Sequence, residues 1–405
     1  MVKYATKSVI VLALISALFS FAKFDHCRNS GWATPDVYVH ACYSDLPALF
    51  GDRGLVTHSW PYSSPTNAVE YPPGTAMVMW ATSWLVPNPR SGYTRFFDIN
   101  AAFIALLFIG AVVLIAKMKP KYWYLLPLSP AVVASLYINW DLWAVISAIG
   151  AIYYFDRKRY DLSALVLGIS IATKFYPIVL LLPIALVFYR DRRVKKLIRY
   201  LGYSLGTWLL INLPFIITTP TGWWRFFKLN GNRGADFGSF WFALDLFGVR
   251  LSNLNYYATI SFLVGAAAFI YYIFLLKKTP TLAQASFFIV VIFTSTSKVY
   301  SPQYVLWLTP LAILAIPHSY RGLVLRRDFW IWQAGEGIYH LAVWQYLAQY
   351  TQSHFGLPEK MYALAIFIRL GTTFWFVGRL IQASSTRELT AQDLEFLSNE
   401  SGGYA

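Results

Sequence analysis

Apolar runs that alternate with short polar gaps fill most of this 405-residue chain. A helix that crosses a membrane needs about 20 apolar residues, with a range of roughly 17–25. The pattern therefore predicts an all-α polytopic membrane protein with about twelve transmembrane helices, several of them short. The predicted spans cover residues 8–24, 97–116, 122–138, 141–155, 161–174, 176–190, 198–218, 256–276, 282–297, 303–317, 329–349 and 359–380.

A long polar stretch interrupts this pattern directly after the first span. Residues 25–74 are rich in Gly and Pro, and the apolar piece 75–86 that follows is too short to cross a membrane. We predict that 25–96 forms an outer loop with short interfacial helices, and that 219–255 forms a second large outer loop. The stretch holds five of the chain's 19 acidic residues, namely Asp25, Asp36, Asp45, Asp52 and Glu70.

Composition and charge support a membrane protein and suggest its orientation. Only 13% of residues are charged, against roughly 25% in soluble domains. The net charge of +15 is spread over short gaps between apolar runs, which argues against a nucleic-acid partner. Most Lys and Arg fall in alternate loops, and cytoplasmic loops are the basic ones. We predict a multi-pass cell-membrane protein whose transmembrane domain covers 1–383, with both termini cytoplasmic and a mobile cytoplasmic tail at 384–405.

The chain lacks several common cofactor signals. It has no Gly-Lys-Ser/Thr phosphate loop, no dinucleotide glycine pattern and no zinc-type Cys/His spacing. We expect no cofactor and no metal, and His58, His340 and His354 are interpreted as isolated residues. Cys27 and Cys42 both lie in the first loop, where a disulfide and two free thiols are equally open.

Acidic residues in and beside the outer loops are the first candidates for catalysis. Asp45 could act as a general base on an attacking hydroxyl, or cap the helix that begins beside it. Asp36 is the second candidate base, with a plain turn residue as its alternative. Glu70 could face the site or cap the next helix. Asp141 could be functional at membrane depth, or could stabilise a helix N-terminus.

Cationic and aromatic residues supply the second group of candidates. Lys174 and Lys298 each stand near a Tyr and a Pro between two spans, where an ammonium could bind a lipid phosphate or extend to the interface. Trp223 and Trp224 could anchor the chain at the interface or stack on sugar rings. Arg233 lies in a Gly/Asn-rich turn that could hold an anion. Glu336, inside a predicted span, is expected to pair with a polar group of a neighbouring helix.

Together these motifs resemble a known class of membrane enzymes, the integral-membrane glycosyltransferases of the C-type fold. Within that class the chain looks like glycosyltransferase family 87, the actinobacterial polyprenyl-phosphate-mannose-dependent mannosyltransferases. The resemblance covers roughly positions 8–380 and rests on Cys42-Tyr-Ser-Asp45-Leu, Arg53-Gly54-Leu55, Pro61-Tyr62, Glu70-Tyr-Pro-Pro73, Asn139-Trp-Asp141, Lys174-Phe-Tyr-Pro177 and Ser301-Pro-Gln-Tyr304.

The resemblance implies that a sugar moves from a polyprenyl phosphate to a glycolipid or glycan of the cell envelope, with inversion. The family uses an Asp of its first outer loop as base, and both Asp45 and Asp36 match that position. Mannose is the expected sugar, with arabinofuranose as the alternative donor. A transporter or flippase of a polyprenyl-linked lipid is the main alternative function. Donor-phosphate contacts are expected from Lys174, Lys298, Arg233, Tyr176 and Tyr300, and substrate contacts from Glu70, Tyr71, Asp141, Trp223, Trp224, Gln303 and Tyr304.

Overall fold

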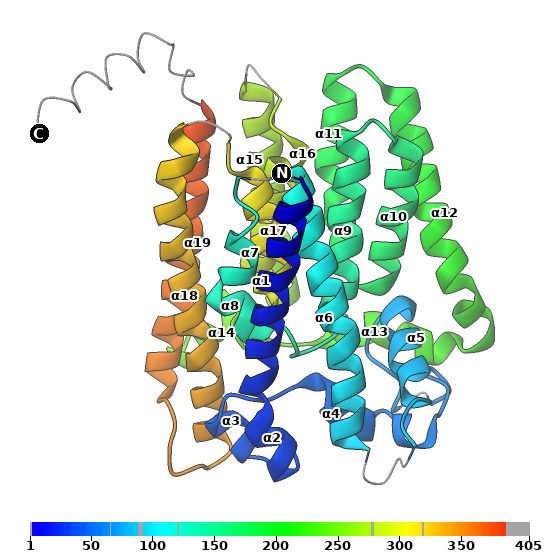
Figure 1. The fold of residues 1–405 in the computed structure, drawn as a ribbon, viewed down its shortest axis with the longest axis vertical. Helices are drawn as coiled ribbons and strands as arrows, with labels where there is room; N and C mark the ends of the chain where they lie inside the picture. Colours follow the sequence, from blue (N-terminus) through cyan, green and yellow to red (C-terminus); the bar gives the residue numbers. More distant parts are fainter. Residues whose placement is uncertain are drawn as a thin grey trace, which may run out of the picture.

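The computed structural model describes residues 2–64, 66–87, 92–119, 121–276, 279–317 and 320–385. These residues form 19 α-helices, with short 3₁₀ turns and no strand among them, which confirms the predicted all-α class (Figure 1). Most of the tail predicted at 384–405 lies outside the described residues.

The first half contains α1 (Val2–Lys23), α2 (Asp25–Ser30), α3 (Asp36–Val39), α4 (Asp45–Asp52), α5 (Pro73–Ser83), α6 (Tyr93–Met118), α7 (Leu125–Leu128), α8 (Pro130–Ser135), α9 (Asp141–Asp156), α10 (Tyr160–Thr173) and α11 (Leu181–Arg190). The second half contains α12 (Val194–Thr218), α13 (Pro220–Asn232), α14 (Phe240–Leu246), α15 (Leu254–Leu275), α16 (Leu282–Thr296), α17 (Val305–Ala315), α18 (Tyr320–Tyr350) and α19 (Glu359–Ser385).

Among the described helices, 4 are long and apolar enough to cross a membrane, namely α6, α12, α15 and α19. Other predicted spans correspond to shorter apolar helices, including α10, α16 and the pieces that end in α11 and α17. The predicted span over 122–138 is not one continuous helix. Ser129 is extended there, because the residue before Pro130 is disfavoured in helical conformation, and the segment splits into α7 and α8.

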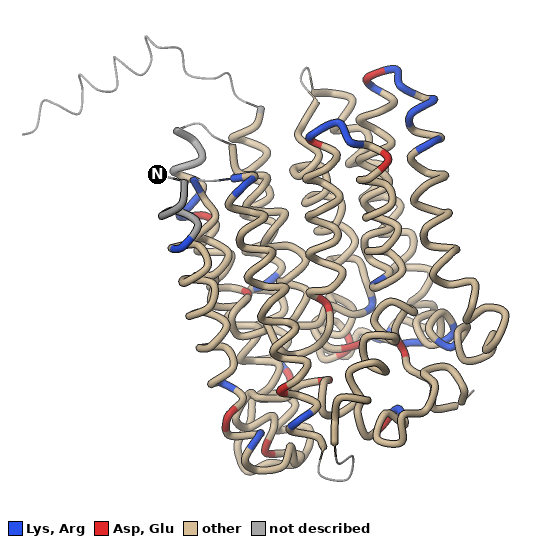
Figure 2. Tube along the Cα trace, turned by 45° about the vertical axis from the view of Figure 1, so that its right-hand side comes forward, with Lys and Arg blue, Asp and Glu red and all other residues tan. Residues whose placement is uncertain are grey.

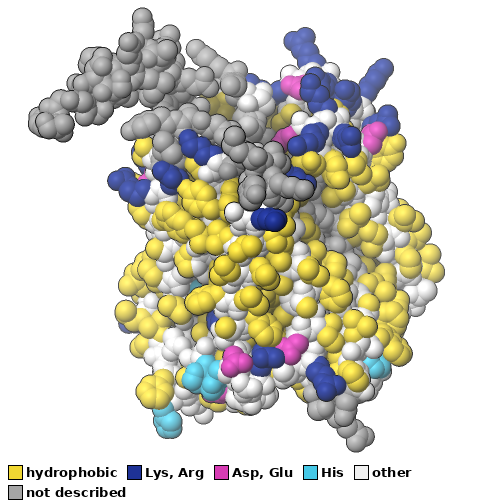
Figure 3. Space-filling model, viewed as in Figure 1, with side chains coloured by type: hydrophobic (Ala, Val, Ile, Leu, Met, Phe, Trp, Pro, Cys, Tyr) yellow, Lys and Arg dark blue, Asp and Glu magenta, His cyan; other side chains and the backbone are white. Residues whose placement is uncertain are grey.

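The helices run side by side, and Lys and Arg are concentrated towards the two ends of the bundle, with a few charged residues between them (Figure 2). The short helices α2–α5 lie with α13 at one end, whereas α1 begins and α19 ends at the other (Figure 1). Lys and Arg cluster at the turn between α11 and α12, at the end opposite α2–α5 (Figure 2). Between the ends, the visible face is largely apolar (Figure 3). Leu210 is 72% exposed and Val264 63% exposed. So much exposed apolar surface is unusual for a soluble monomer and marks a face that contacts lipid or protein.

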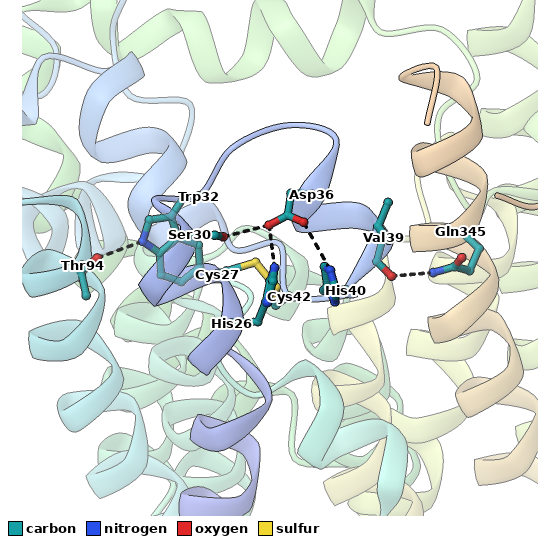
Figure 4. The surroundings of a disulfide bond; sticks show 10 residues. All are labelled: His26, Cys27, Ser30, Trp32, Asp36, Val39, His40, Cys42, Thr94 and Gln345. Carbon is teal, nitrogen blue, oxygen red and sulfur yellow. Dashed lines mark hydrogen bonds and ion pairs between the residues drawn. A yellow bond between two sulfur atoms is a disulfide. The ribbon is translucent and has the colours of Figure 1, made fainter. Parts of the chain in front are cut away.

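A disulfide closes the start of the first loop. The sequence left open whether the two cysteines of this loop are bonded or free. Cys27 and Cys42 are bonded and fully buried (Figure 4). The same loop is fixed to α6, because the Arg28 guanidinium donates to both carboxylate oxygens of Asp98 at 2.8 and 2.9 Å. It is fixed to α18 as well, since the Gln345 amide donates to the Val39 carbonyl at 3.1 Å.

Loss of this disulfide should destabilise the protein measurably. The bond joins residues 15 positions apart. Closing a loop of that size lowers the entropy of the unfolded chain and stabilises the native state by about 3 kcal/mol. We expect the Cys27→Ser/Cys42→Ser variant to unfold at a lower temperature than the native protein in the same detergent. Dithiothreitol should lower the unfolding temperature of the native protein and leave that of the variant unchanged. If reductant left both unchanged, the disulfide would not stabilise this loop.

Candidate active site

Asp45 begins α4 with its carboxylate free of any capping role. The neighbouring Ser44 is the N-cap, because its hydroxyl oxygen accepts the Leu46 amide at 3.1 Å. The same hydroxyl donates to the Tyr137 carbonyl at 2.7 Å and so docks the helix start on the core. The capping alternative for Asp45 is therefore wrong.

Two tyrosine hydroxyls hold the Asp45 carboxylate in place. Tyr43 donates to Oδ1 at 3.0 Å and Tyr71 to Oδ2 at 3.1 Å. Burial raises the pKa of Asp45, while the two hydrogen bonds and the charge of Lys174 limit the rise. A carboxylate with a raised pKa is a stronger base than an exposed one, and this property suits proton abstraction.

Asp141 and Lys174, predicted from two separate segments, form an ion pair next to this carboxylate. The Lys174 ammonium lies 2.6 Å from Asp141 Oδ1. The Trp307 indole donates to the other oxygen of Asp141 at 2.8 Å, and Asp141 is 1% exposed. The Lys174 ammonium also lies 4.4 Å from the centre of the Tyr71 ring. Asp45, Tyr71, Asp141 and Lys174 therefore form one connected group, which we call the acid–lysine cluster.

Stacked aromatic rings line one side of the acid–lysine cluster. Trp307 stacks on Tyr176 with ring centres 4.0 Å apart, and on Tyr304 at 3.6 Å. Both tyrosines were predicted as site residues from their motifs, and the structure brings them to Asp141 through Trp307. The amide nitrogen of the buried Asn139 has no hydrogen-bond partner among the described residues. A buried amide donor without a partner is uncommon in proteins.

The prolines and glycine before α5 explain how Tyr71 reaches Lys174. Pro73 starts α5, where its fixed φ suits the first helical turn. A Cβ on Gly74 would come within 2.7 Å of the Thr173 backbone, so only glycine allows this approach. Thr75 then donates to the Thr173 carbonyl at 2.7 Å. The start of α5 is thereby docked on the end of α10, one residue before Lys174.

Lys298 and Arg233, the other predicted phosphate ligands, lie in a second arrangement nearby. The Lys298 ammonium donates to the Asn230 and Arg233 carbonyls at 2.8 and 2.7 Å, at the end of α13. Burial and the charge of Arg233 lower the pKa of Lys298. Arg233 pairs with Asp236 at 2.7 Å. It lines a cleft of about 840 Å³. Arg233 thus lies at an open cleft, whereas the ammonium of Lys298 is engaged by the turn after α13.

Several other predicted residues serve to join the loops. One carboxylate oxygen of Glu70 accepts hydrogen bonds from the Arg53 guanidinium at 2.7 Å and from the Arg225 guanidinium at 3.0 Å. Because Arg225 belongs to α13, these bonds tie the first loop to that helix. Trp223 donates to the Asn212 side chain at 2.9 Å and lines a narrow aromatic crevice beside Tyr71. Trp224 is 55% exposed at the same end, and Gln303 is buried.

Asp36, the second candidate base, has a different environment. Its carboxylate accepts from Ser30 at 2.8 Å and faces His26 at 2.7 Å and His40 at 3.3 Å. Burial opposes ionisation of Asp36, but the bonds from Ser30 and His26 outweigh it and hold its pKa below the usual value. The described contacts of Asp36 include no member of the acid–lysine cluster.

The chain matches no protein-family model and no curated protein. The assignment of chemistry to this site therefore rests on the geometry of the acid–lysine cluster and on the short motifs that supply it.

Some site residues were not predicted from the sequence. Trp307 lies in an apolar run, where nothing distinguishes an indole that binds Asp141 from one that contacts lipid. Arg369 is fully buried in α19 and pairs with Glu336 at 2.9 Å, which confirms the expectation that Glu336 finds a polar partner. The Tyr300 hydroxyl lies 3.4 Å from Glu336, so this predicted phosphate ligand belongs to that buried pair. The grouping of His26 and His40 around Asp36 was also missed, because the three residues lack a familiar metal-binding spacing.

Proposed function

We propose that this chain is a membrane glycosyltransferase of the C-type fold, similar to family 87. It moves a sugar, mannose, from a polyprenyl phosphate to a glycolipid or glycan of the cell envelope. The observation that supports this most is Asp45, a partly buried carboxylate held by two tyrosines beside an ammonium group. That arrangement suits general-base catalysis with an anionic leaving group.

In this proposal Asp45 acts on the acceptor and the cations act on the donor. Asp45 removes the proton from the acceptor hydroxyl as its oxygen bonds to the anomeric carbon. The bond from that carbon to the phosphate oxygen breaks on the opposite face, so the configuration inverts. The polyprenyl phosphate leaves with one more negative charge, which Lys174 and Arg233 stabilise. Lys174 shares its charge with Asp141, and Arg233 extends the positive field towards the cleft.

The proposed donor also fits the aromatic surroundings of the cluster. The crevice beside Tyr71 is lined by prolines and aromatic rings of α12 and α13, including Phe226 and Trp223. An isoprenoid chain is apolar and would lie along the aromatic rings of this crevice, whose volume of about 10 Å³ does not admit the chain itself, while its phosphate remains at the polar end. The cleft beyond Arg233 is the candidate place for the acceptor.

The proposal includes a topology of about twelve membrane passages, in which short helices such as α10, α11, α16 and α17 cross within the bundle. The end with α2–α5 would face outward, with both termini cytoplasmic. The Cys27–Cys42 disulfide supports this side, since disulfides persist in oxidising compartments. The basic turn between α11 and α12 at the opposite end agrees with positive cytoplasmic loops.

A transfer assay tests the function directly. Purified protein in detergent would receive polyprenyl-phosphate-[¹⁴C]mannose and a lipid extract of a bacterial cell envelope. We expect labelled glycolipid to form together with free polyprenyl phosphate, and no reaction with a nucleotide-linked sugar. A parallel arm with polyprenyl-phosphate-arabinofuranose tests the alternative donor. If neither donor were consumed, yet vesicles with the protein moved labelled lipid between leaflets, the flippase alternative would hold and the enzyme proposal would fail.

A further inference from the structure

A group of two histidines and one carboxylate lies on the first loop, outside the acid–lysine cluster. His26 Nε2 is 2.7 Å from one oxygen of Asp36, and His40 Nε2 is 3.3 Å from the other. The two imidazole rings stack with centres 3.6 Å apart. The three ligand atoms all lie within 4.8 Å of one another. Figure 4 shows both rings turned towards the same carboxylate.

The surrounding structure fixes these three side chains relative to one another. His26 precedes Cys27 in α2, and His40 lies at the end of α3 two residues before Cys42, so the disulfide joins the two ligand-bearing segments. The Ser30 hydroxyl donates to Asp36 at 2.8 Å and orients its carboxylate. Metal-binding carboxylates commonly have such a second hydrogen bond.

We propose that His26, Asp36 and His40 bind one divalent transition-metal ion of the Zn²⁺ class. Zn²⁺ binds His nitrogen and carboxylate oxygen at about 2.0–2.2 Å, which places tetrahedral ligand atoms about 3.3 Å apart. The distances of 2.7 and 3.3 Å to the two Asp36 oxygens are close to that spacing, and ligand atoms that lie up to 4.8 Å apart must approach one another when the ion binds. Imidazole and carboxylate together favour Zn²⁺ and its neighbours over Mg²⁺ or Ca²⁺, which prefer oxygen ligands alone.

A simple histidine–aspartate ion pair explains this arrangement less well. Such a pair uses one imidazole ring, whereas here two rings stack on each other and each directs a nitrogen at the same carboxylate. A bound dication neutralises the carboxylate and accepts a lone pair from each ring. The side chains of His26 and His40 are 45% and 46% exposed, so an ion can reach them from solution.

Metal titration of the full-length protein tests the site. The protein is purified without a histidine tag or reductant, treated with EDTA and dialysed, and then titrated with ZnCl₂ by calorimetry. We expect one Zn²⁺ per chain, and a visible absorption band when Co²⁺ replaces it. Replacing one of the three ligands, as in His26→Ala or His40→Ala, should weaken Zn²⁺ binding by more than about 100-fold. Ser30→Ala, which removes the bond that orients Asp36, should weaken it about tenfold.

Matched controls separate this site from adventitious binding and from catalysis. His354→Ala removes an exposed histidine far from Asp36 in the sequence and should bind Zn²⁺ like the native protein. Asp45→Asn should also bind normally, because Asp45 is outside the group. Exposed ligands can be replaced without loss of the fold, which equal unfolding temperatures in EDTA would verify. Absence of Zn²⁺ binding, or undiminished binding by the His26→Ala/His40→Ala variant, would overturn the proposal.

Discussion

The Asp45→Asn variant is expected to lose about a thousandfold of the sugar-transfer rate while it unfolds at no lower temperature than the native protein. A positioned general base contributes roughly 10²–10⁴ to a rate, and an amide cannot accept the hydroxyl proton. The amide oxygen can still accept one tyrosine hydrogen bond, so the loop keeps its anchor at Tyr43 or Tyr71.

The effect of this variant on stability follows from the pKa of Asp45. Burial raises that pKa in the folded protein above its unfolded value, so the native state binds the proton more tightly than the unfolded chain does. The free energy of unfolding therefore falls as the pH rises from the unfolded pKa through the folded one. Asparagine has no charge to bury. Above the pKa of Asp45 in the folded protein, the variant therefore avoids the fall in the free energy of unfolding that the buried carboxylate causes. A variant that lost activity through misfolding would show the opposite change in unfolding temperature.

The pH profile of kcat/KM provides an independent measurement. Activity requires the ionised carboxylate, so the rate should rise with pH through the pKa of Asp45 and level off above it. Asp36→Asn is the matched control, because it removes the other candidate base from the same loop. We expect this control to keep the native rate and profile. Full activity in Asp45→Asn, or loss of activity in Asp36→Asn alone, would contradict the assignment of Asp45.

The sequence identified the important residues more readily than their partners. Asp141 and Lys174 stand out because they lie at the end of or inside apolar runs, where charged groups are costly. Asp45 stands out because it lies in the polar loop, just before Pro47 and an apolar helical turn. The ion pair between Asp141 and Lys174 could not be predicted, since two lysines, Lys174 and Lys298, stand in equivalent motifs. Their different roles arise from packing: α5 places Tyr71 over Lys174, whereas the end of α13 occupies Lys298 with carbonyl oxygens.

The fold class was predictable, but the number of membrane passages was not. Hydrophobic runs predict helices well, and the long helices α6, α12, α15 and α19 match predicted spans. Runs interrupted by proline do not form single helices, as at Pro130 and at Pro177, where a short turn precedes α11. Burial inside the bundle also allows polar groups in apolar helices. Glu336 and Arg369 show this, since only the folded chain reveals that they face each other.

The Arg369→Met variant should lose about 3–5 kcal/mol of stability, because it leaves the Glu336 charge buried without its partner. Arg369 and Glu336 are 0% and 1% exposed as side chains. The Arg369 guanidinium also donates to the Tyr300 carbonyl at 2.5 Å and the Ser301 carbonyl at 3.2 Å, and lies 3.4 Å from the centre of the Tyr300 ring. It therefore holds the segment that leads to Tyr304, and its loss should lower transfer activity as well.

A comparison of single and double variants separates the charge from the packing. Glu336→Gln/Arg369→Met removes both charges and should be more stable than Arg369→Met alone, because no unpaired carboxylate remains in the core. Unfolding by a denaturing detergent, followed by Trp fluorescence, measures the difference between the two. Arg369→Lys is the matched control: it keeps the charge but cannot bond Glu336, Tyr300 and Ser301 together. Equal stability of the single and double variants would mean that Arg369 stabilises the core through its backbone contacts and not through Glu336.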